Sequence, residues 1–518
     1  MAHIAVLERR ARDGGSTRPT RRAGEPRFLL WAALGGFAII TALGLRSHTL
    51  WFDEMQAWNI ARASGSPGDL VANLRYEGHP ILWYLPLYAL TRLTGNPHAM
   101  QVLQFLIAVA TAAIVLFRAP LRPAVRVVLL AGYFFAFEYG VFSRSYGLGV
   151  LLLVVALTFL ARPAPRWVWA TAALLALAFT SLPGAVLAVA VAATVVLSPR
   201  LRAATPARVM ATAVVVGAAL VTVLCVPPDD FGTLTPGLGD SSRFGSGIAV
   251  RIASSASAAW RALVPVPATV GEWNSNLLDG QPGAVWIEAA LAVGLFAALL
   301  VALRAHPFAR RLWWVGSVGL FAFFVVVTRP EAARHAGFVF LLFVACLWTA
   351  AAPPGEPRPE TRSLRASGAL GILVIVVLAA QVLATLAVYP RASTEDFSRD
   401  PVLADAIVAA GLDGRIVSAQ DWDATTIGGY VDRDVHSLAR DERIRFVTTD
   451  ERQECGIARL DAASVVCDAT AIARRDGAPV AVVVAGELPG YRPLVTNDGA
   501  SVYVLEPDDA PSSCRRAR

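Results

Sequence analysis

Two adjacent carboxylates, Asp53 and Glu54, stand in the aromatic stretch LWFDEMQAW, directly after the first long apolar run of the sequence. Ionisable side chains at the edge of a bilayer are costly and commonly functional. A carboxylate in this place could take the proton of an attacking hydroxyl. Asp53 followed by Gln56 also fits a capping box that opens a helix, so a structural role stays open, but capping gives Glu54 no purpose.

Polar residues recur where later apolar runs begin or end. His79 stands in the stretch YEGHP, and Arg144 and Tyr146 stand in the stretch FSRSYG. A histidine at an interface can be only a polar anchor, and a single arginine at the end of a span can snorkel to headgroups. Arg144 would also lie within reach of a lipid phosphate.

The segment TRPEAARHAGF brings Arg329, Arg334 and His335 to the start of a late apolar run. Arginines on the outer face oppose the usual charge bias of membrane proteins and therefore indicate an anionic ligand; ion pairs with Glu331 are the structural alternative. A carboxylate pair, arginines and interfacial aromatic residues together fit transfer of a group from a lipid-phosphate carrier. The carboxylate would take the hydroxyl proton, and the arginines would neutralise the departing phosphate.

These residues require a membrane scaffold. Hydrophobic residues make up 55% of the 518 residues and charged residues only 16%, which excludes an ordinary soluble enzyme and indicates a polytopic membrane protein. Apolar windows of roughly 17 to 25 residues predict about eleven transmembrane helices. The predicted spans lie near 28–45, 99–117, 127–142, 146–161, 167–181, 183–198, 209–226, 284–303, 312–327, 336–351 and 366–388.

Arginine alone sets the predicted orientation, because the sequence contains no lysine and carries a formal charge of +7. The basic N-terminal segment 1–27 and alternate short loops are rich in arginine, so they should be cytoplasmic. The N-terminus is then inside, and the outer face of the membrane carries loops 46–98 and 227–283 and the tail 389–518. The basic segment is explained by topology, so no nucleic-acid partner is predicted.

The outer segments have their own expected structure. In the first loop, Ile81–Leu93 is too short to cross the membrane and predicts an interfacial helix anchored by Trp83, Tyr84 and Tyr88. In the second loop, IASSASAAWRALVPVP predicts a short surface helix.

The tail 389–518 predicts a small α/β domain. GRIVSAQ, RIRFVTT, APVAVVVAG and ASVYVLEP resemble short strands, and DPVLADAIVAAG an amphipathic helix. A disulfide between Cys455 and Cys467 is possible in an oxidising compartment, although the spacing does not establish it. The sequence has no nucleotide-binding loop and no zinc-type ligand spacing, so no cofactor and no metal site are predicted.

The succession LWFDEMQAW, HPILWYLPLYALTRLTG and SRSYGLGVLLL resembles the membrane glycosyltransferases of the GT-C fold. The resemblance is to the bacterial group of glycosyltransferase family 39 type that includes protein O-mannosyltransferases and the lipid A aminoarabinose transferase. It covers residues 28–160 well and the remainder by topology only. The chain departs from the group's pattern at Ile81, where a second proline is frequent, and before Arg144, where Gln-Glu is common.

The resemblance implies a GT-C module at 28–388 and a reaction. The donor would be a polyprenyl-phosphate sugar, transfer would invert the anomeric centre, and the acceptor would be an envelope glycan, lipid or protein. Asp53 would be the catalytic base. The residues expected to bind substrate are Glu54, His79, Arg144, Tyr146, Arg334 and His335. The composition suits a GC-rich bacterium that adds mannose or arabinose to its envelope.

Two alternatives remain from the sequence. A transporter or lipid flippase should carry ionisable residues near the middle of its spans, whereas Glu138 and Glu288 stand close to span ends. A polymerase or ligase of lipid-linked sugars would also use outer arginines, but it does not predict an Asp-Glu pair directly after the first span.

Overall fold

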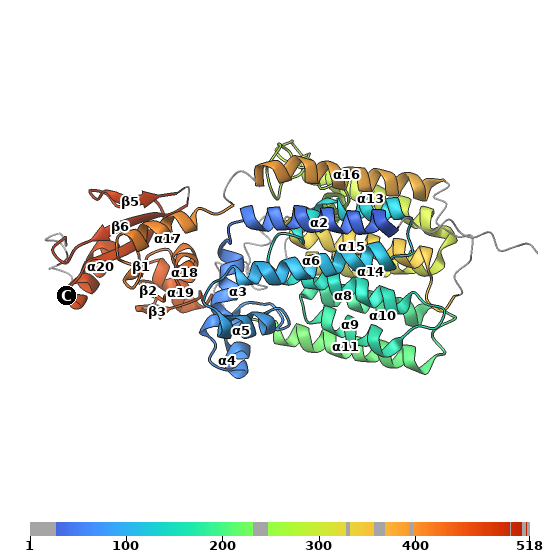
Figure 1. Cartoon of the computed structure of the whole chain (residues 1–518), viewed down its shortest axis with the longest axis horizontal. Coiled ribbons are helices and arrows are strands. Elements are labelled where there is room, and N and C mark those ends of the chain that lie inside the picture. Colours follow the sequence, from blue (N-terminus) through green and yellow to red (C-terminus); the bar gives the residue numbers. More distant parts are fainter. Residues whose placement is uncertain are drawn as a thin grey trace, which may run out of the picture.

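The computed structural model describes residues 27–230, 247–327, 332–356, 368–392, 397–497, 499–509 and 514. It consists of a bundle of long helices with a small sheet domain at one end (Figure 1). The short helix α3 (Phe52–Ala63) lies between these two parts. The expected combination of a polytopic helical protein and a small C-terminal α/β domain is confirmed.

Ten of the eleven predicted spans each overlap one helix, because an apolar segment away from water must satisfy its backbone polar groups internally. The predicted span 127–142 is wrong as a single helix, since it is divided between α7 and a short π-helix, η2 (Phe134–Glu138). Among the described residues, seven helices are long and apolar enough to cross a membrane, and three shorter apolar helices accompany them. The count of about eleven crossings stays a prediction. The bundle helices are α2 (Arg27–Ser47), α6 (Ala99–Arg118), α7 (Pro123–Leu130), α8 (Ser145–Leu160), α9 (Trp167–Ala178), α10 (Leu182–Leu197), α11 (Thr205–Leu224), α12 (Ile248–Leu263), α13 (Ala284–Ala302), α14 (Pro307–Val326), α15 (Ala333–Ala351) and α16 (Ala369–Ala392).

Helix α15 forms the centre of the bundle. All its residues from Ala336 to Ala351 are buried, and α8, α12 and α14 pack against it. A helix that is apolar on every side is stable only when neighbours surround it. Its N-terminal residues carry the predicted Arg334 and His335, so the best-packed helix of the bundle supports this part of the site.

The second outer loop differs from its prediction. Helix α12 is not a surface helix, since it packs between α13 and α15 and buries its small residues. Arg261 near its C-terminal end pairs with the buried Glu288 of α13 (Nε to Oε2, 2.9 Å) and with Asp279. The many Ala and Ser residues, from which a surface helix was predicted, instead allow α12 to pack closely against α13 and α15.

The first outer loop folds into α3, α4 (Pro67–Asn73), a 3₁₀ turn η1 (Leu74–Tyr76) and α5 (Tyr84–Leu93). The predicted interfacial segment therefore contains a helix, but the predicted anchors Trp83 and Tyr84 are wrong. Both side chains are buried, and α5 packs against α3. Only Tyr88 is partly exposed, and its hydroxyl donates to the main-chain oxygen of Gly65 (3.2 Å).

The predicted capping box at Asp53 is also wrong. Helix α3 begins at Phe52 with Trp51 as the N-cap residue, which places Asp53 at the second helical position. The third position is Glu54, and its Oε2 accepts from the main-chain N–H of Trp51 (3.4 Å). Asp53 therefore has no capping bond that would explain its carboxylate.

The C-terminal domain is a six-stranded mixed sheet in the order β3-β2-β1-β4-β6-β5. Strand β1 is parallel to β2 and β4, and the other pairings are antiparallel. The predicted strand segments contain β1, β4 and β6 and overlap β3, and the predicted amphipathic helix is α17. The elements are α17 (Asp400–Ala409), β1 (Ile416–Ser418), α18 (Asp421–Tyr430), β2 (Val435–Ser437), β3 (Glu442–Ile444), α19 (Glu451–Ile457), α20 (Ala462–Asp476), β4 (Val480–Val484), β5 (Pro493–Thr496) and β6 (Ser501–Leu505).

A disulfide joins Cys467 to Cys514, so the bridge between Cys455 and Cys467 that the sequence left open is not formed. Cys455 is exposed and has a free thiol. Helix α20 packs its apolar side on β4 and β6, and its Cys467 bonds Cys514. Sequence spacing could not choose between two partners on opposite sides of the same residue.

We predict that Cys514→Ser destabilises the C-terminal domain. The disulfide closes a separation of 47 residues, and loss of such a cross-link costs about 4 kcal/mol in the chain-entropy account. Thermal unfolding of the purified full-length chain, followed by proteolysis of the tail, measures the effect. Cys455→Ser is the control, and an equal loss of stability in both variants would contradict the assignment.

Candidate active site

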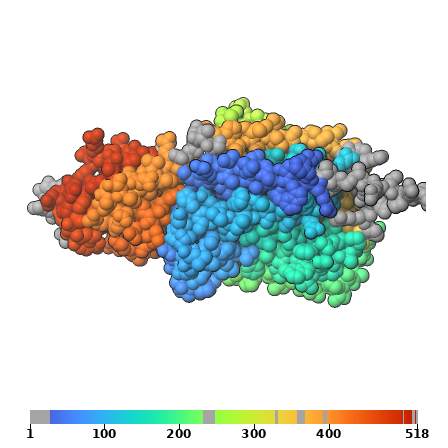
Figure 2. Space-filling model, viewed as in Figure 1, coloured from blue at the N-terminus to red at the C-terminus, as the bar shows by residue number. Residues whose placement is uncertain are grey.

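The predicted site residues meet where the bundle, loop 46–98 and the C-terminal domain come together. Figure 2 shows loop 46–98, in blue, packed against the orange part of the C-terminal domain. The N-termini of α3, α8 and α15 converge here, beginning at Phe52, Ser145 and Ala333. Helix N-termini present unpaired N–H groups and a positive dipole end, which favours anions.

Asp53 is in contact with two arginines that lie far apart in the sequence. Its Oδ2 lies 3.1 Å from Nη1 of Arg334, at the start of α15. Its main-chain oxygen accepts a hydrogen bond from Nη1 of Arg144, the residue before α8. The side chain of Asp53 is 16% exposed, so the carboxylate is largely withdrawn from water but remains reachable.

Charge determines the protonation state of Asp53. Burial opposes ionisation of the carboxyl group, but the positive charges of Arg144 and Arg334 outweigh it and lower the pKa of Asp53 below its ordinary value. Asp53 is therefore an ionised carboxylate at neutral pH. The guanidinium of Arg334 also lies 5.5 Å from the ring of Trp51, in cation–π range.

His79 lies in the loop after η1, close enough to Asp53 and Arg144 for their charges to act on its ring. Its Nδ1 is 2.7 Å from the main-chain oxygen of Glu77. Burial, assisted by the charge of Arg144, lowers the pKa of His79 to about 4. The ring is neutral at pH 7, and because a carbonyl oxygen only accepts, Nδ1 carries the proton and Nε2 is left as an acceptor.

Tyr146 and His335 lie next to the two arginines of the site, Arg144 and Arg334. The hydroxyl of Tyr146 lies 3.1 Å from Nε2 of His335, which joins the first turns of α8 and α15. Tyr139 donates from its hydroxyl to the main-chain oxygen of Arg334 (2.7 Å). Residues that stand almost 200 positions apart in the sequence thus form one cluster. Arg329 and Glu331 lie outside the described residues.

Glu54 is placed differently from the other predicted residues. Its side chain is fully buried, with Oε2 2.6 Å from Nε2 of His48 and Oε1 accepting from the main-chain N–H of Ser143 (2.6 Å). Both oxygens are bonded inside the protein, so the geometry favours a bracing role between the end of α2 and the loop before α8. The predicted contact of Glu54 with substrate stays a prediction.

Sequence reasoning missed several residues around Asp53. Glu77 is one: burial raises the pKa of its carboxyl group, and its Oε1 accepts from Nε2 of Gln56 (2.7 Å). Trp273 is another, packed 5.7 Å from the ring of Trp51 and donating from Nε1 to Glu138 (2.9 Å). In the sequence, Trp273 is notable only as a tryptophan in a polar loop, and no pattern indicates that it binds Glu138.

The described ranges contain no group of three or more His, Cys, Asp and Glu side chains that could hold a metal ion. The chemistry that the described cluster itself offers is proton transfer to a carboxylate beside a cationic anion-binding surface.

We predict that Glu54→Ala lowers the stability of the bundle much more than Asp53→Ala does. Removing one partner of a buried hydrogen-bonded pair costs roughly 1–3 kcal/mol, because the other partner is left unpaired. Thermal unfolding in detergent measures this, and His48→Ala should lose a similar amount without adding to Glu54→Ala. Unchanged stability in Glu54→Ala would argue that the carboxylate serves a ligand.

No protein-family model matches the sequence, and no curated protein matches it. Two crystal structures of ArnT from Cupriavidus metallidurans are similar to the chain, each at 15% identity. The structure bound to undecaprenyl phosphate covers 95% of this chain and 99% of its own, with a TM-score of 0.50. The apo structure covers 91% and 98%, with a TM-score of 0.46. At this identity the similarity to the first structure shows a fold, and the GT-C fold expected from the resemblance is confirmed.

Proposed function

We propose that the protein is a membrane glycosyltransferase that moves a sugar from a polyprenyl-phosphate donor to an envelope acceptor. The observation that carries this proposal is the ionised carboxylate of Asp53 beside two arginines, Arg144 and Arg334, at three converging helix N-termini. This arrangement offers a base and an anion-binding surface within a few ångströms of each other. Transfer from a phosphate leaving group needs both.

The cationic side of the site suits a phosphodiester. Arg334 can offer a planar set of N–H donors, and the N-termini of α8 and α15 add main-chain N–H groups and positive dipole ends. The structural neighbour ArnT was crystallised with undecaprenyl phosphate, which supports a polyprenyl carrier for the donor of this chain.

The proposed reaction is a single displacement. An acceptor hydroxyl attacks the anomeric carbon from the face opposite the phosphate, so a carbon–oxygen bond to the acceptor forms while the bond to the phosphate oxygen breaks, with inversion. Asp53 takes the hydroxyl proton. The arginines hold the polyprenyl phosphate, whose negative charge grows as it leaves.

Donor binding would also strengthen the base. The pKa of Asp53 is low because the positive charges of Arg144 and Arg334 outweigh the effect of burial. A phosphate that engages the arginines reduces the positive potential at Asp53, so the pKa of Asp53 rises and the carboxylate becomes a better proton acceptor. Proton transfer is thereby favoured only when the donor is in place.

The remaining predicted residues have roles consistent with this reaction. The neutral His79 offers Nε2 as an acceptor for a sugar hydroxyl. The pair of Tyr146 and His335 offers further polar groups next to Arg334.

The location that we propose is the outer face of the bacterial cytoplasmic membrane. Arginine-rich loops alternate along the sequence, which supports an N-terminus inside and a C-terminal domain outside. The disulfide between Cys467 and Cys514 supports this, because disulfides persist in oxidising compartments and are rare in the cytosol.

Asp53→Asn should abolish transfer while leaving the protein folded and in the membrane, since the amide fills the same space but cannot take a proton. The test uses membranes with radiolabelled polyprenyl-phosphate mannose and, separately, with the arabinose donor, and measures label in an envelope fraction. Asp69→Asn, at the exposed start of α4 in the same loop, is the matched control.

Label that appears with wild type and Asp69→Asn but not with Asp53→Asn supports the proposal and identifies the donor. Near-normal turnover by a folded Asp53→Asn would remove Asp53 from the role of base. If neither donor gave transfer with wild type, the transporter and polymerase hypotheses would replace this one.

Arg334→Gln should raise the KM for the donor by about tenfold or more, since a charge-assisted contact to phosphate is lost. It should also move the acidic limb of the pH–rate profile to higher pH. The base works only when ionised, so activity disappears as the pH falls through the pKa of Asp53, and without Arg334 that pKa rises. Arg75→Gln, exposed in the same loop, is the control. An unchanged donor KM and acidic limb would contradict the role of Arg334.

A further inference from the structure

We propose that the C-terminal domain is a working part of the active site, because it fixes the positions of Asp53 and His79 through the buried side chain of Gln56. In this inference Gln56 is a positioning residue. It rests on the proposed function for the identity of the base, and it adds a role for the C-terminal domain.

Helix α3 presents one row of polar side chains to the C-terminal domain. Gln56, Asn59 and Arg62 follow one another at intervals of three, which puts them on the same side of the helix. Asn59 donates from Nδ2 to the main-chain oxygen of Thr425 in α18 (2.8 Å). Each member of this row binds a residue more than 360 positions later in the sequence.

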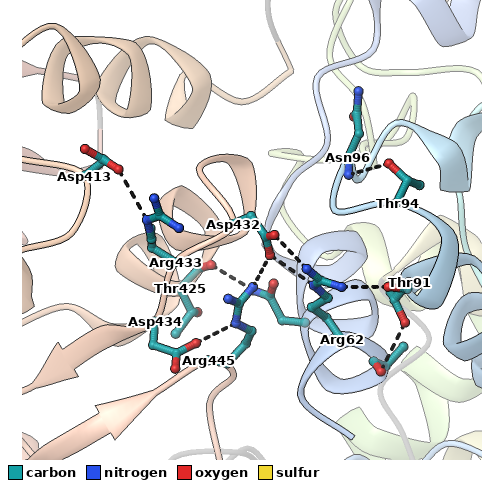
Figure 3. Close-up of polar contacts among 12 residues, drawn as sticks. Arg62, Thr91, Thr94, Asn96, Asp413, Thr425, Asp432, Arg433, Asp434 and Arg445 are labelled. Atoms are coloured by element: carbon teal, nitrogen blue, oxygen red, sulfur yellow. Dashed lines mark hydrogen bonds and ion pairs between the residues drawn. The ribbon is translucent and has the colours of Figure 1, made fainter. Parts of the chain in front are cut away.

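Arg62 forms the charged end of this row (Figure 3). Its Nη2 and Nε lie 2.8 and 3.1 Å from the two carboxylate oxygens of Asp432. Its Nη1 donates to the main-chain oxygen of Thr91 in α5 (2.7 Å). Arg445 reinforces Asp432 from the other side (2.7 Å) and also binds Asp434 (2.6 Å). Arg62 therefore joins α3, α5 and the turn after α18, and its contact with Asp432 is bidentate. Such a contact stabilises the interface more than a single exposed ion pair does.

Close packing accompanies these bonds. Gly429 in α18 faces α3, and a Cβ at this position would collide with Sδ of Met55 and crowd Oδ1 of Asn59. Tyr430 donates from its hydroxyl to the main-chain oxygen of Leu50, just before α3 (2.7 Å). The contact therefore covers the helix and the residues that lead into it, including the turn that carries Asp53.

Gln56 connects the contact between α3 and the C-terminal domain to the loop that carries His79. Its amide binds the main chain of Val447 twice, with Nε2 2.7 Å from the oxygen and Oε1 3.0 Å from the nitrogen. The same Nε2 donates to Oε1 of Glu77 (2.7 Å), whose main-chain oxygen binds His79. A primary amide has two N–H donors, and Gln56 donates two hydrogen bonds here while its oxygen accepts one. One buried side chain thus holds α3, the loop of His79 and the segment after β3 together.

The position of Asp53 depends on this attachment. Asp53 stands in the first turn of α3, one turn before Gln56, so a shift or tilt of α3 changes the distance between its carboxylate and Arg334. A displacement of about 1 Å at a reacting group can lower a rate by roughly a hundredfold. The C-terminal domain supplies the contacts that prevent such a displacement.

Kinetics of Gln56→Ala and Asp432→Asn test this inference. We expect Gln56→Ala to lower kcat by about tenfold or more with a smaller change in the donor KM, because geometry and not donor affinity is lost. The acidic limb of its pH–rate profile should move to higher pH, since a loosened contact with Arg334 lets the pKa of Asp53 rise. Asp432→Asn should act in the same direction with a smaller amplitude. Arg433→Ala removes an exposed ion pair with Asp413 in the same domain (3.3 Å) and should leave both quantities unchanged (Figure 3).

Hydrogen exchange of the full-length variants provides a measurement that does not need activity. Gln56→Ala should increase exchange at 52–63 and 76–79, and leave α13 and α14 at wild-type rates. Unchanged exchange in both segments, or a kcat loss matched by a lower folded fraction with an unmoved acidic limb, would overturn the inference. If wild type showed no transfer from either donor, the proposed function would fail, and the exchange result would still decide whether the C-terminal domain holds α3.

Discussion

The ion pair between Asp53 and Arg334 is the interaction on which the arrangement of the site depends. A largely buried carboxylate would favour its neutral form, and a neutral acid cannot serve as a base. The positive charges of Arg334 and Arg144 reverse this preference and keep Asp53 ionised. The same charges would attract a phosphate, so one electrostatic feature would serve both the proposed base and the proposed leaving group.

Much of the surrounding structure holds this pair in place. The side chain of Asn274 accepts from the main-chain N–H of Ala333 (2.6 Å) and so caps the helix that carries Arg334. Asn274 has a left-handed backbone conformation (φ 64°), which asparagine tolerates better than most residues. On the opposite side, Glu54 binds His48 and the loop before Arg144. The helices that meet at the site are therefore each fixed by a polar bond close to their first residue.

The sequence predicted the parts of this arrangement that depend on local pattern. Apolar runs marked the bundle helices, and Asp53, Arg144, Tyr146 and Arg334 were recognisable because polar groups at span ends need a reason. The structure brings these residues together. The neutral state of His79 and the internal pairing of Glu54 were not predictable, because both depend on burial and on partners from other segments. The burial of α12 was missed for a similar reason, since its small polar residues suit both a surface and a tightly packed interface.

Helix α3 is the clearest example of an element whose burial could not be predicted from local sequence pattern. Its residues from Glu54 to Ala61 are all buried, although Glu54, Gln56 and Asn59 are polar. No amphipathic pattern can describe such a helix, and buried polar groups are tolerated only when partners satisfy them. Those partners come from α2, from the loop before α8, and from the C-terminal domain. The position of the helix that carries Asp53 therefore depends on contacts with both the bundle and the C-terminal domain, so the geometry of the site depends on segments from the whole chain.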